Sequence, residues 1–175
     1  MSHTSFLEEI EKKIKKGKDL EEAARDFSWQ DFEAAVSEVL SANGFRIFRN
    51  FRFSSNKRRF EIDVIAISKP RIMLIDCKHW GIRLGKTSAI RSAATAQTNR
   101  SAEFSKKLAE FVDFGLEEWK DAIIIPLILT LYQEQVVEND GSVVVPFFKL
   151  NSFIEESRNG IFDFKVVKVG RITSW

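Results

Sequence analysis

Apolar residues recur at helical spacing soon after the start of the chain. The stretch begins after Ser28 and ends at Asn43-Gly44, and its apolar positions are Phe32, Val36, Val39 and Leu40. Ser28-x-x-Asp31 resembles a capping box, and Asn followed by Gly is typical of a helix C-terminus. The pattern therefore predicts an amphipathic helix with one face against a core.

Weaker helical patterns occupy three other parts of the chain. Residues Ser88–Phe111 carry an apolar stripe that Gln97 interrupts, and Thr4–Phe27 is charged and weakly amphipathic. Ser152-x-x-Glu155 predicts the capped start of a short helix. We expect a charged helical arm over residues 1–27 and one domain over residues 28–175, a size that suits a single core.

Strand-like segments lie between these helices. They are rich in Ile, Val and Phe, and they are Phe45–Ser54, Phe60–Ile67, Ile72–Lys78, Ala122–Leu131, Val143–Phe148 and Phe162–Val169. The turn residues 68–71 separate the second segment from the third. The order of helices and strands predicts an α/β protein with a central mixed β-sheet flanked by helices. All apolar runs are too short to span a bilayer, so no membrane partner is expected.

An acidic residue two positions before a lysine occurs four times, and context selects one of the four pairs. Glu11/Lys13 and Glu118/Lys120 fall on predicted charged helices, where residues two apart do not share a face. Asp163/Lys165 lies on a predicted strand without a neighbouring acid. Asp76/Lys78 ends a strongly apolar strand, where a buried charge is costly unless it has a partner or a metal.

Asp63 is the matching acid for Asp76. If the second and third strand segments form a hairpin centred between Lys69 and Pro70, Asp63 lies opposite Asp76, and Lys78 projects from the same face. Facing carboxylates repel each other unless a cation lies between them, and oxygen ligands suit Mg²⁺ or Mn²⁺. The backbone carbonyl of Cys77 is placed to be a further ligand. A one-residue shift of the assumed register would break this arrangement.

These residues resemble the PD-(D/E)XK nuclease superfamily. Asp63 is followed 13 residues later by Asp76-Cys77-Lys78, which is the spacing of the superfamily's signature. The helix that begins at Trp29-Gln30-Asp31 resembles the first helix of the superfamily. The resemblance covers roughly Trp29 to Phe111 and is closest to Mrr-type restriction endonucleases and archaeal Holliday-junction resolvases. The resemblance implies a restriction-endonuclease-like fold and a Mg²⁺-dependent endodeoxyribonuclease, with Mn²⁺ as a substitute, that acts on DNA as a homodimer. It also implies site roles for Glu33, which holds a metal-bound water, and for Gln97.

Two other functions fit the same residues. The fold also occurs as a non-catalytic module that binds nucleic acid or supports assembly. An RNA-processing nuclease is a second alternative, because the preference for DNA rests on the family resemblance alone. Glu61 is interpreted as the ion-pair partner of a neighbouring arginine.

Charge is distributed unevenly and favours a polyanionic partner. Residues 45–107 hold 15 Lys and Arg against 4 Asp and Glu, while the remaining residues hold 12 basic and 21 acidic residues. Such a basic region suits the phosphate backbone of a nucleic acid. The predicted phosphate contacts are Arg46, Arg49, Arg52, Lys57, Arg58, Arg59, Arg83, Lys86 and Arg91.

Cysteine and histidine are scarce. The single cysteine, Cys77, excludes an internal disulfide, and two histidines are too few for a histidine-based zinc site. The composition indicates a reducing, cytoplasmic compartment and no small-molecule cofactor.

Overall fold

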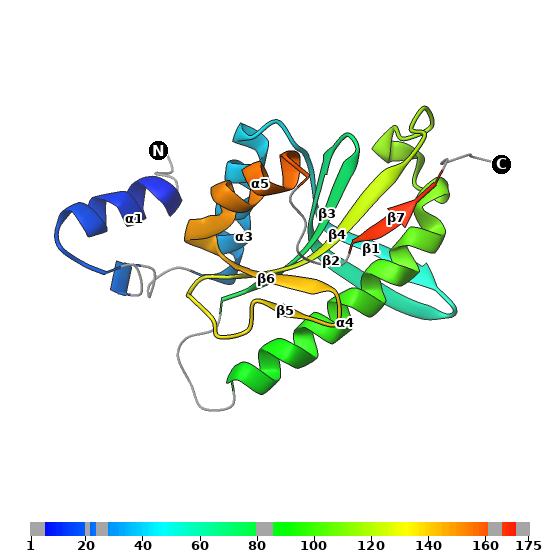
Figure 1. Cartoon of the computed structure of the whole chain (residues 1–175). Helices are drawn as coiled ribbons and strands as arrows, with labels where there is room; N and C mark the ends of the chain where they lie inside the picture. Colours follow the sequence, from blue (N-terminus) through cyan, green and yellow to red (C-terminus); the bar gives the residue numbers. More distant parts are fainter. Residues whose placement is uncertain (1–5, 20–21, 24–27, 80–85, 161–165, 171–175) are drawn as a thin grey trace.

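A mixed β-sheet of seven strands forms the centre of the computed structural model, which describes residues 6–19, 22–23, 28–79, 86–160 and 166–170 (Figure 1). The strands are β1 (Arg46–Ser55), β2 (Arg58–Ser68), β3 (Arg71–Lys78), β4 (Ala122–Thr130), β5 (Glu138–Asn139), β6 (Ser142–Pro146) and β7 (Val167–Val169). Neighbouring strands follow the order β1-β2-β3-β4-β6-β5, and β7 pairs with β4. The first three strands are antiparallel neighbours, whereas β3, β4 and β6 run parallel.

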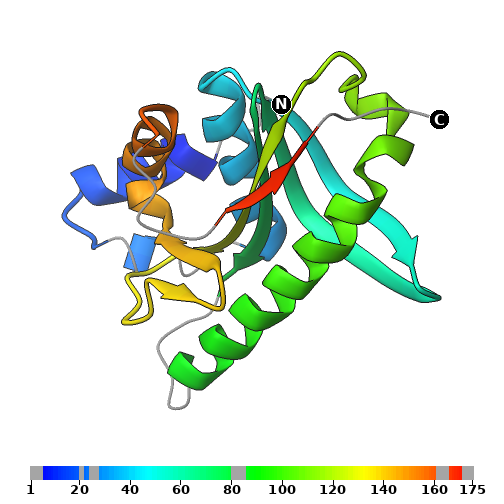
Figure 2. The same cartoon turned by 45° about the vertical axis from the view of Figure 1, so that its right-hand side comes forward.

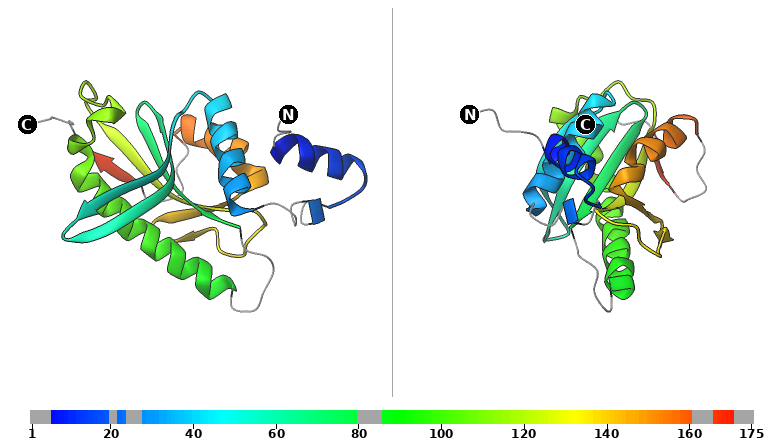
Figure 3. Two further views of the ribbon diagram at one scale, coloured as in Figure 1. Left: turned by 180° about the vertical axis from the view of Figure 1, so that it is seen from behind. Right: turned by 90° about the vertical axis from the view of Figure 1, so that its left-hand side faces the viewer.

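Helices cover both faces of the sheet. Figures 2 and 3 show α4 (Lys86–Lys107) crossing one face of the sheet, while α3 (Trp29–Ala42) and α5 (Leu150–Arg158) lie apart from α4. Alternate residues of the strands divide between two cores. Val64 and Ile75 belong to the core that includes α3 and α5, and Ile65 and Leu74 belong to the core that includes α4. The predicted α/β architecture with a central mixed sheet flanked by helices is therefore confirmed.

The helix boundaries follow local sequence signals in part. Ser28 forms the expected capping box with Asp31, and α3 ends at Asn43. The predicted end at Phe111 is wrong, because α4 stops at Lys107 and two short 3-10 helices follow, Leu108–Glu110 and Val112–Phe114. The predicted cap at Ser152 is also wrong, because α5 begins at Leu150, within whose first turn Ser152 lies.

The N-terminal arm is described only in part. Its helix α1 (Phe6–Lys15) packs against α3, and Ile10 and Ala23 are buried in the core on that side of the sheet. No helix in the described part of the chain has the length and apolar character needed to cross a membrane.

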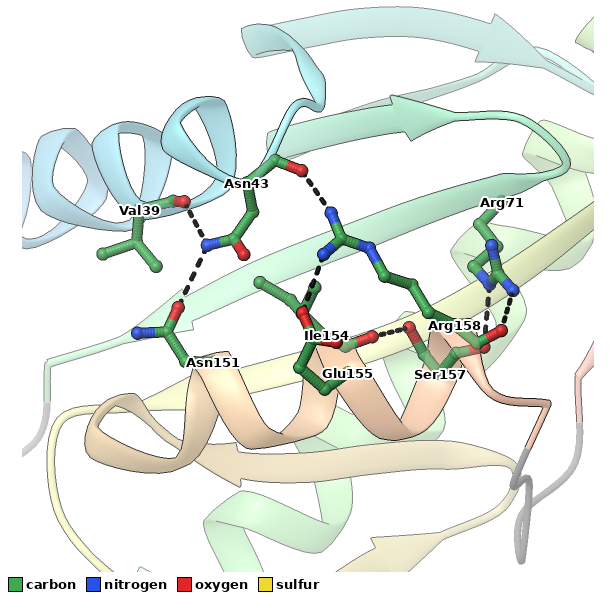
Figure 4. A network of polar contacts seen from close by, with 8 residues as sticks. All are labelled: Val39, Asn43, Arg71, Asn151, Ile154, Glu155, Ser157 and Arg158. Carbon is green, nitrogen blue, oxygen red and sulfur yellow. Dashed lines mark hydrogen bonds and ion pairs between the residues drawn. The ribbon is translucent and has the colours of Figure 1, made fainter.

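A polar network joins α5 to the rest of its layer (Figure 4). Arg71, at the start of β3, donates hydrogen bonds of 2.8 Å to the carbonyl oxygens of Ser157 and Arg158. The guanidinium of Arg158 in turn donates to the carbonyl oxygen of Asn43, at the end of α3. These contacts bring side-chain donors to carbonyl groups at the ends of α3 and α5, and they hold α3, α5 and β3 together.

Candidate active site

The predicted β2–β3 hairpin register is confirmed. Val64 lies opposite Ile75 and Ile65 opposite Leu74, which places Asp63 and Asp76 one step beyond the last pair at that end of the ladder. The same register puts the carboxylates at the point where β2 and β3 cease to pair. The two strands can therefore separate locally and leave room between them for polar groups.

Asp63 lies where the alternation of β2 changes phase. The side chains of β2 that pack into the core beneath α4 are Phe60 and Ile62 before Asp63, and Ile65 and Ile67 after it. A regular strand would send even-numbered and odd-numbered residues to opposite faces throughout. The alternation of side chains in β2 therefore shifts by one residue at Asp63, a kind of irregularity that is common beside active sites.

β1 makes the matching change at Asn50. The ladder pairs Arg49 with Val64 and Phe51 with Ile62, and it omits Asn50 and Asp63, which lie between these pairs. Asn50 has a φ of 50°, a left-handed conformation that asparagine tolerates better than most residues. The two strands thus bend together beside the Asp63 carboxylate.

Asp63 is tied to the neighbouring strand by its side chain. Its Oδ2 atom accepts a hydrogen bond of 2.8 Å from the backbone N–H of Cys77. Burial and the negative charge of Asp76 raise the pKa of Asp63 above its usual value. In a strand, the N–H and C=O of one residue point to the same side, so the carbonyl of Cys77 is also directed toward β2.

Asp76 is held by two cations. Its side chain is 8% exposed, Lys78 Nζ lies 2.7 Å from its Oδ2, and Arg100 Nη1 lies 3.3 Å from its Oδ1. The expected proximity of Lys78 to Asp76 is therefore present. Arg100 was not among the residues that sequence patterns selected, although it lies three residues after Gln97 on the same helix, a spacing that brings side chains together.

Gln97 connects α4 to this cluster. Its side chain is fully buried, its Nε2 donates a hydrogen bond of 2.6 Å to the carbonyl of Leu74, and its Oε1 accepts one from Arg100. Both ends of the amide are thus satisfied, as a buried amide requires. Gln97 therefore contacts the Arg100 guanidinium, which in turn contacts the Asp76 carboxylate.

Glu33 enters the site from α3. It is 1% exposed, and neither of its carboxylate oxygens has a hydrogen-bond partner among the described residues. Arg49 Nη2 lies 3.7 Å away, within ion-pair range but beyond a hydrogen bond. Burial, followed by the charge of Asp63, raises the pKa of Glu33 to about 7. A buried carboxylate without donors is a place where a water or a cation would be favoured.

The ligands present suit a hard divalent cation with an incomplete protein shell. Within the described residues, no three His, Cys, Asp or Glu side chains are grouped closely enough to hold a metal ion by themselves. Mg²⁺ commonly takes only one or two carboxylates and completes its shell with water and substrate phosphate. Asp63, Asp76 and the Cys77 carbonyl fit that requirement. The Cys77 thiol packs into the core beneath α3, and burial raises its pKa well above the usual value.

The predicted phosphate contacts divide into four groups. Lys57, Arg58, Arg59 and Arg91 are exposed and have no ion-pair partner among the described residues. Arg49 and Arg52 are exposed but paired, and Arg52 Nε lies 2.9 Å from Glu61, as expected for that glutamate. Arg83 lies outside the described residues.

Two further basic residues are not placed as free phosphate contacts. Lys86 Nζ lies 2.6 Å from Glu134, and the two side chains are only 11% and 10% exposed. Arg46 donates to the carbonyl of Phe114 and covers the ring of Phe48. Both therefore serve packing in this structure. Glu118, placed on a helix by the sequence pattern, lies instead in a turn.

A cleft of about 590 Å³ lies between the tip of the β1–β2 hairpin and α4. Arg58 lines it from the hairpin, and Asn99 and Lys106 line it from the helix. Ser55 and Asn56 bind Glu103 of α4 at 2.6 and 3.0 Å and hold the tip in place. The exposed cations Lys57, Arg58 and Arg59 therefore project from an anchored hairpin.

Comparisons with known proteins place the site within a recognised domain. A family model described as a nuclease-related domain matches residues 28–128, more than half of the chain and all of the site described above. An uncharacterized protein of Archaeoglobus fulgidus is 25% identical over 126 residues, covering 72% of this chain and 88% of that protein. The crystal structure of a protein of unknown function, AF1548, aligns with 75% of this chain at 18% identity and a TM-score of 0.37. The chain spans about half of that protein, 54% of its length.

Proposed function

The chain belongs to the nuclease-related domain family, and from this premise we propose that it is a metal-dependent endonuclease that hydrolyses the phosphodiester bonds of DNA. The observation that carries the proposal is the meeting of Asp63 and Asp76 beyond the last pair of the β2–β3 ladder, with Lys78 on Asp76. Two near carboxylates and an adjacent ammonium group are the elements of a site for phosphoryl transfer.

Each side chain has a role that its position supports. Asp63, Asp76 and the Cys77 carbonyl would hold Mg²⁺ or Mn²⁺, which supplies a bound water of lowered pKa and stabilises charge on the phosphate. Lys78 orients the attacking water and offsets the negative charge that develops on the phosphate. Glu33, whose buried carboxylate oxygens have no hydrogen-bond partner among the described residues, is suited to accept a proton from that water.

DNA is the proposed substrate, and a homodimer is the proposed assembly. The exposed cations of the β1–β2 hairpin would contact phosphates without reading bases. A symmetric dimer would present two sites to the two strands of a duplex. The finer resemblance to Mrr-type restriction endonucleases and to Holliday-junction resolvases makes linear and branched DNA the two substrate classes to compare.

One observation favours a second function. Asp76 has two cationic partners, Lys78 and Arg100. A carboxylate paired with two cationic side chains also suits a module that binds nucleic acid and does not cut it.

The test is cleavage of end-labelled linear duplex, single-stranded and four-way-junction DNA and of single-stranded RNA, with Mg²⁺, Mn²⁺ or EDTA. The proposal expects metal-dependent cutting of DNA that Asp63→Asn abolishes and that the control Lys107→Gln retains, because Lys107 is half-buried at the end of α4 and pairs with Glu110. Binding without cutting under every condition would favour the non-catalytic module, and cutting of RNA alone would favour an RNA-processing nuclease.

A further inference from the structure

Arg100 is the part of the site whose role the proposed nuclease function leaves open. Its guanidinium contacts two groups, Oδ1 of Asp76 at 3.3 Å and the amide oxygen of Gln97. The Arg100 side chain is 22% exposed, so it lies at the border between the buried cluster and solvent. The inference below rests on the proposed function, because it concerns what happens to Arg100 when a cation binds.

Gln97 fixes the direction from which Arg100 approaches. The Nε2 atom of Gln97 donates to the carbonyl of Leu74 at 2.6 Å, in the middle of β3. Because that carbonyl can only accept, the amide nitrogen must face it, and the amide oxygen must face away. The oxygen is thus presented to Arg100, three residues along the same helix. The sheet thereby determines where the guanidinium lies.

Asp76 has one cation on each oxygen. Lys78 takes Oδ2 at 2.7 Å, and Arg100 takes Oδ1. The guanidinium group of arginine is a fixed positive charge. A divalent cation that binds the same carboxylate meets a fixed positive charge beside it, and the two repel.

We propose that Arg100 is a counter-ion that exchanges partners: it occupies the Asp76 carboxylate in the metal-free site and turns to the scissile phosphate when a divalent cation takes that carboxylate. A phosphate bound to the cation would lie within reach of the guanidinium, because the cation would bind the carboxylate that Arg100 contacts in this structure. Arginine is well suited to the second partner, since its planar fork of N–H groups matches phosphate oxygens. Gln97 retains its contact with β3 and acts as a positioning residue.

The proposal predicts that one substitution at Arg100 strengthens metal binding and slows cleavage. Removing the charge with Arg100→Gln should tighten Mn²⁺ binding to the DNA-free protein by about 5- to 10-fold, because the competing cation is gone. The same change should lower the single-turnover cleavage rate at saturating Mn²⁺ by about 100-fold, because a donor to the phosphate is lost. A purely structural role predicts weaker metal binding together with slower cleavage.

The experiment measures Mn²⁺ affinity of the full chain by calorimetry and cleavage of the preferred DNA substrate in the same preparations. Arg100→Lys keeps the charge and should keep the wild-type Mn²⁺ affinity within about twofold while recovering part of the rate. Lys107→Gln, at a half-buried position that pairs with Glu110 at the end of the same helix, should match the wild type in both measurements. Thermal unfolding of each variant confirms that it is folded.

The outcomes separate this inference from the function beneath it. If wild type binds Mn²⁺ and cuts DNA, but a folded Arg100→Gln shows unchanged or weaker Mn²⁺ binding, the exchange of partners is wrong and the nuclease function stands. If wild type binds no Mn²⁺ and cuts nothing, the nuclease function and this inference fail together. Tighter Mn²⁺ binding with slower cleavage supports both.

Discussion

The Asp63 carboxylate accepts a 2.8 Å hydrogen bond from the backbone N–H of Cys77, immediately beyond the last pair of the β2–β3 ladder. A side chain thus takes the place of the backbone group that would have continued the ladder. This side-chain contact keeps β2 and β3 apart beyond the pair Val64–Ile75, and the Cys77 carbonyl faces the space beside Asp63 and Asp76. The site therefore arises from the point at which regular pairing stops.

Replacing Asp63 with asparagine removes the negative charge of the side chain and keeps its shape. The introduced amide oxygen would still accept a hydrogen bond from Cys77, while the burial of a charge and the repulsion by Asp76, which raise the pKa of Asp63, would be removed. We expect Asp63→Asn to leave the free energy of unfolding of the metal-free protein unchanged or higher by up to about 1 kcal/mol. Mn²⁺ should no longer raise its unfolding temperature. Urea and thermal unfolding with Mn²⁺ or EDTA measure both effects, and undiminished metal stabilisation of the variant would contradict the ligand role.

Glu33 should make the stability of the metal-free protein depend on pH. Folding raises its pKa from 4.5 to about 7, so the folded chain binds more protons than the unfolded chain between these values. Stability must therefore fall as pH rises through this window, by up to roughly 3 kcal/mol. Glu33→Gln should remove this component. Urea unfolding in EDTA at pH 5, 6 and 7.5 tests it, and parallel profiles for the two proteins would show that the Glu33 carboxylate does not titrate in this range.

The tip of the β1–β2 hairpin should contribute to binding through phosphate contacts. Arg58 and Arg59 are exposed and unpaired among the described residues, so Arg58→Gln combined with Arg59→Gln should weaken DNA binding at low salt. The slope of log K against log salt should fall by about 1 to 2, since each phosphate contact contributes about 0.9. Lys15→Gln on α1, where Lys15 is 72% exposed, is the matched control. An unchanged slope would place the DNA elsewhere.

The aromatic core beneath the β1–β2 hairpin should contribute strongly to the free energy of unfolding of the protein. Phe104 is fully buried, and its ring packs against Phe51, Phe53, Phe111 and Phe114. Phe104→Ala should lower the free energy of unfolding by about 3 to 5 kcal/mol. Phe148→Ala, at a ring that is 55% exposed, should cost less than about 1 kcal/mol. Similar costs for the two substitutions in urea unfolding would show that the packing beneath α4 is loose.

Sequence patterns predicted the sheet and the β2–β3 register because both depend on neighbouring segments. The turn between β2 and β3 was sufficient to place Asp63 and Asp76 at the same level, one step beyond the pair Val64–Ile75. The same reasoning could not foresee the change of phase at Asn50, because nothing in the alternation of β1 marks where it will be interrupted. It also left unresolved which of the exposed arginines have acidic partners.

The residues that sequence reasoning missed or misplaced are those whose partners lie far along the chain. Arg100 reaches Asp76 only because α4 crosses beneath β3, so its role depends on tertiary packing. Lys86 resembled a free cation, but its partner Glu134 comes from a segment that follows β4. In contrast, Glu61 was paired correctly, since Arg52 lies directly across the β1–β2 ladder.

The most direct test of the account is the single-turnover cleavage rate of wild type and Lys78→Ala on linear and four-way-junction DNA with Mn²⁺, and with EDTA as the blank. Lys78 lies 2.7 Å from Asp76 and is 23% exposed, so its removal takes a positive charge from the reacting phosphate. The account predicts metal-dependent cleavage by wild type and a loss of at least about 100-fold in a folded Lys78→Ala. Equal cleavage by the two proteins would show that the chemistry does not occur at this site.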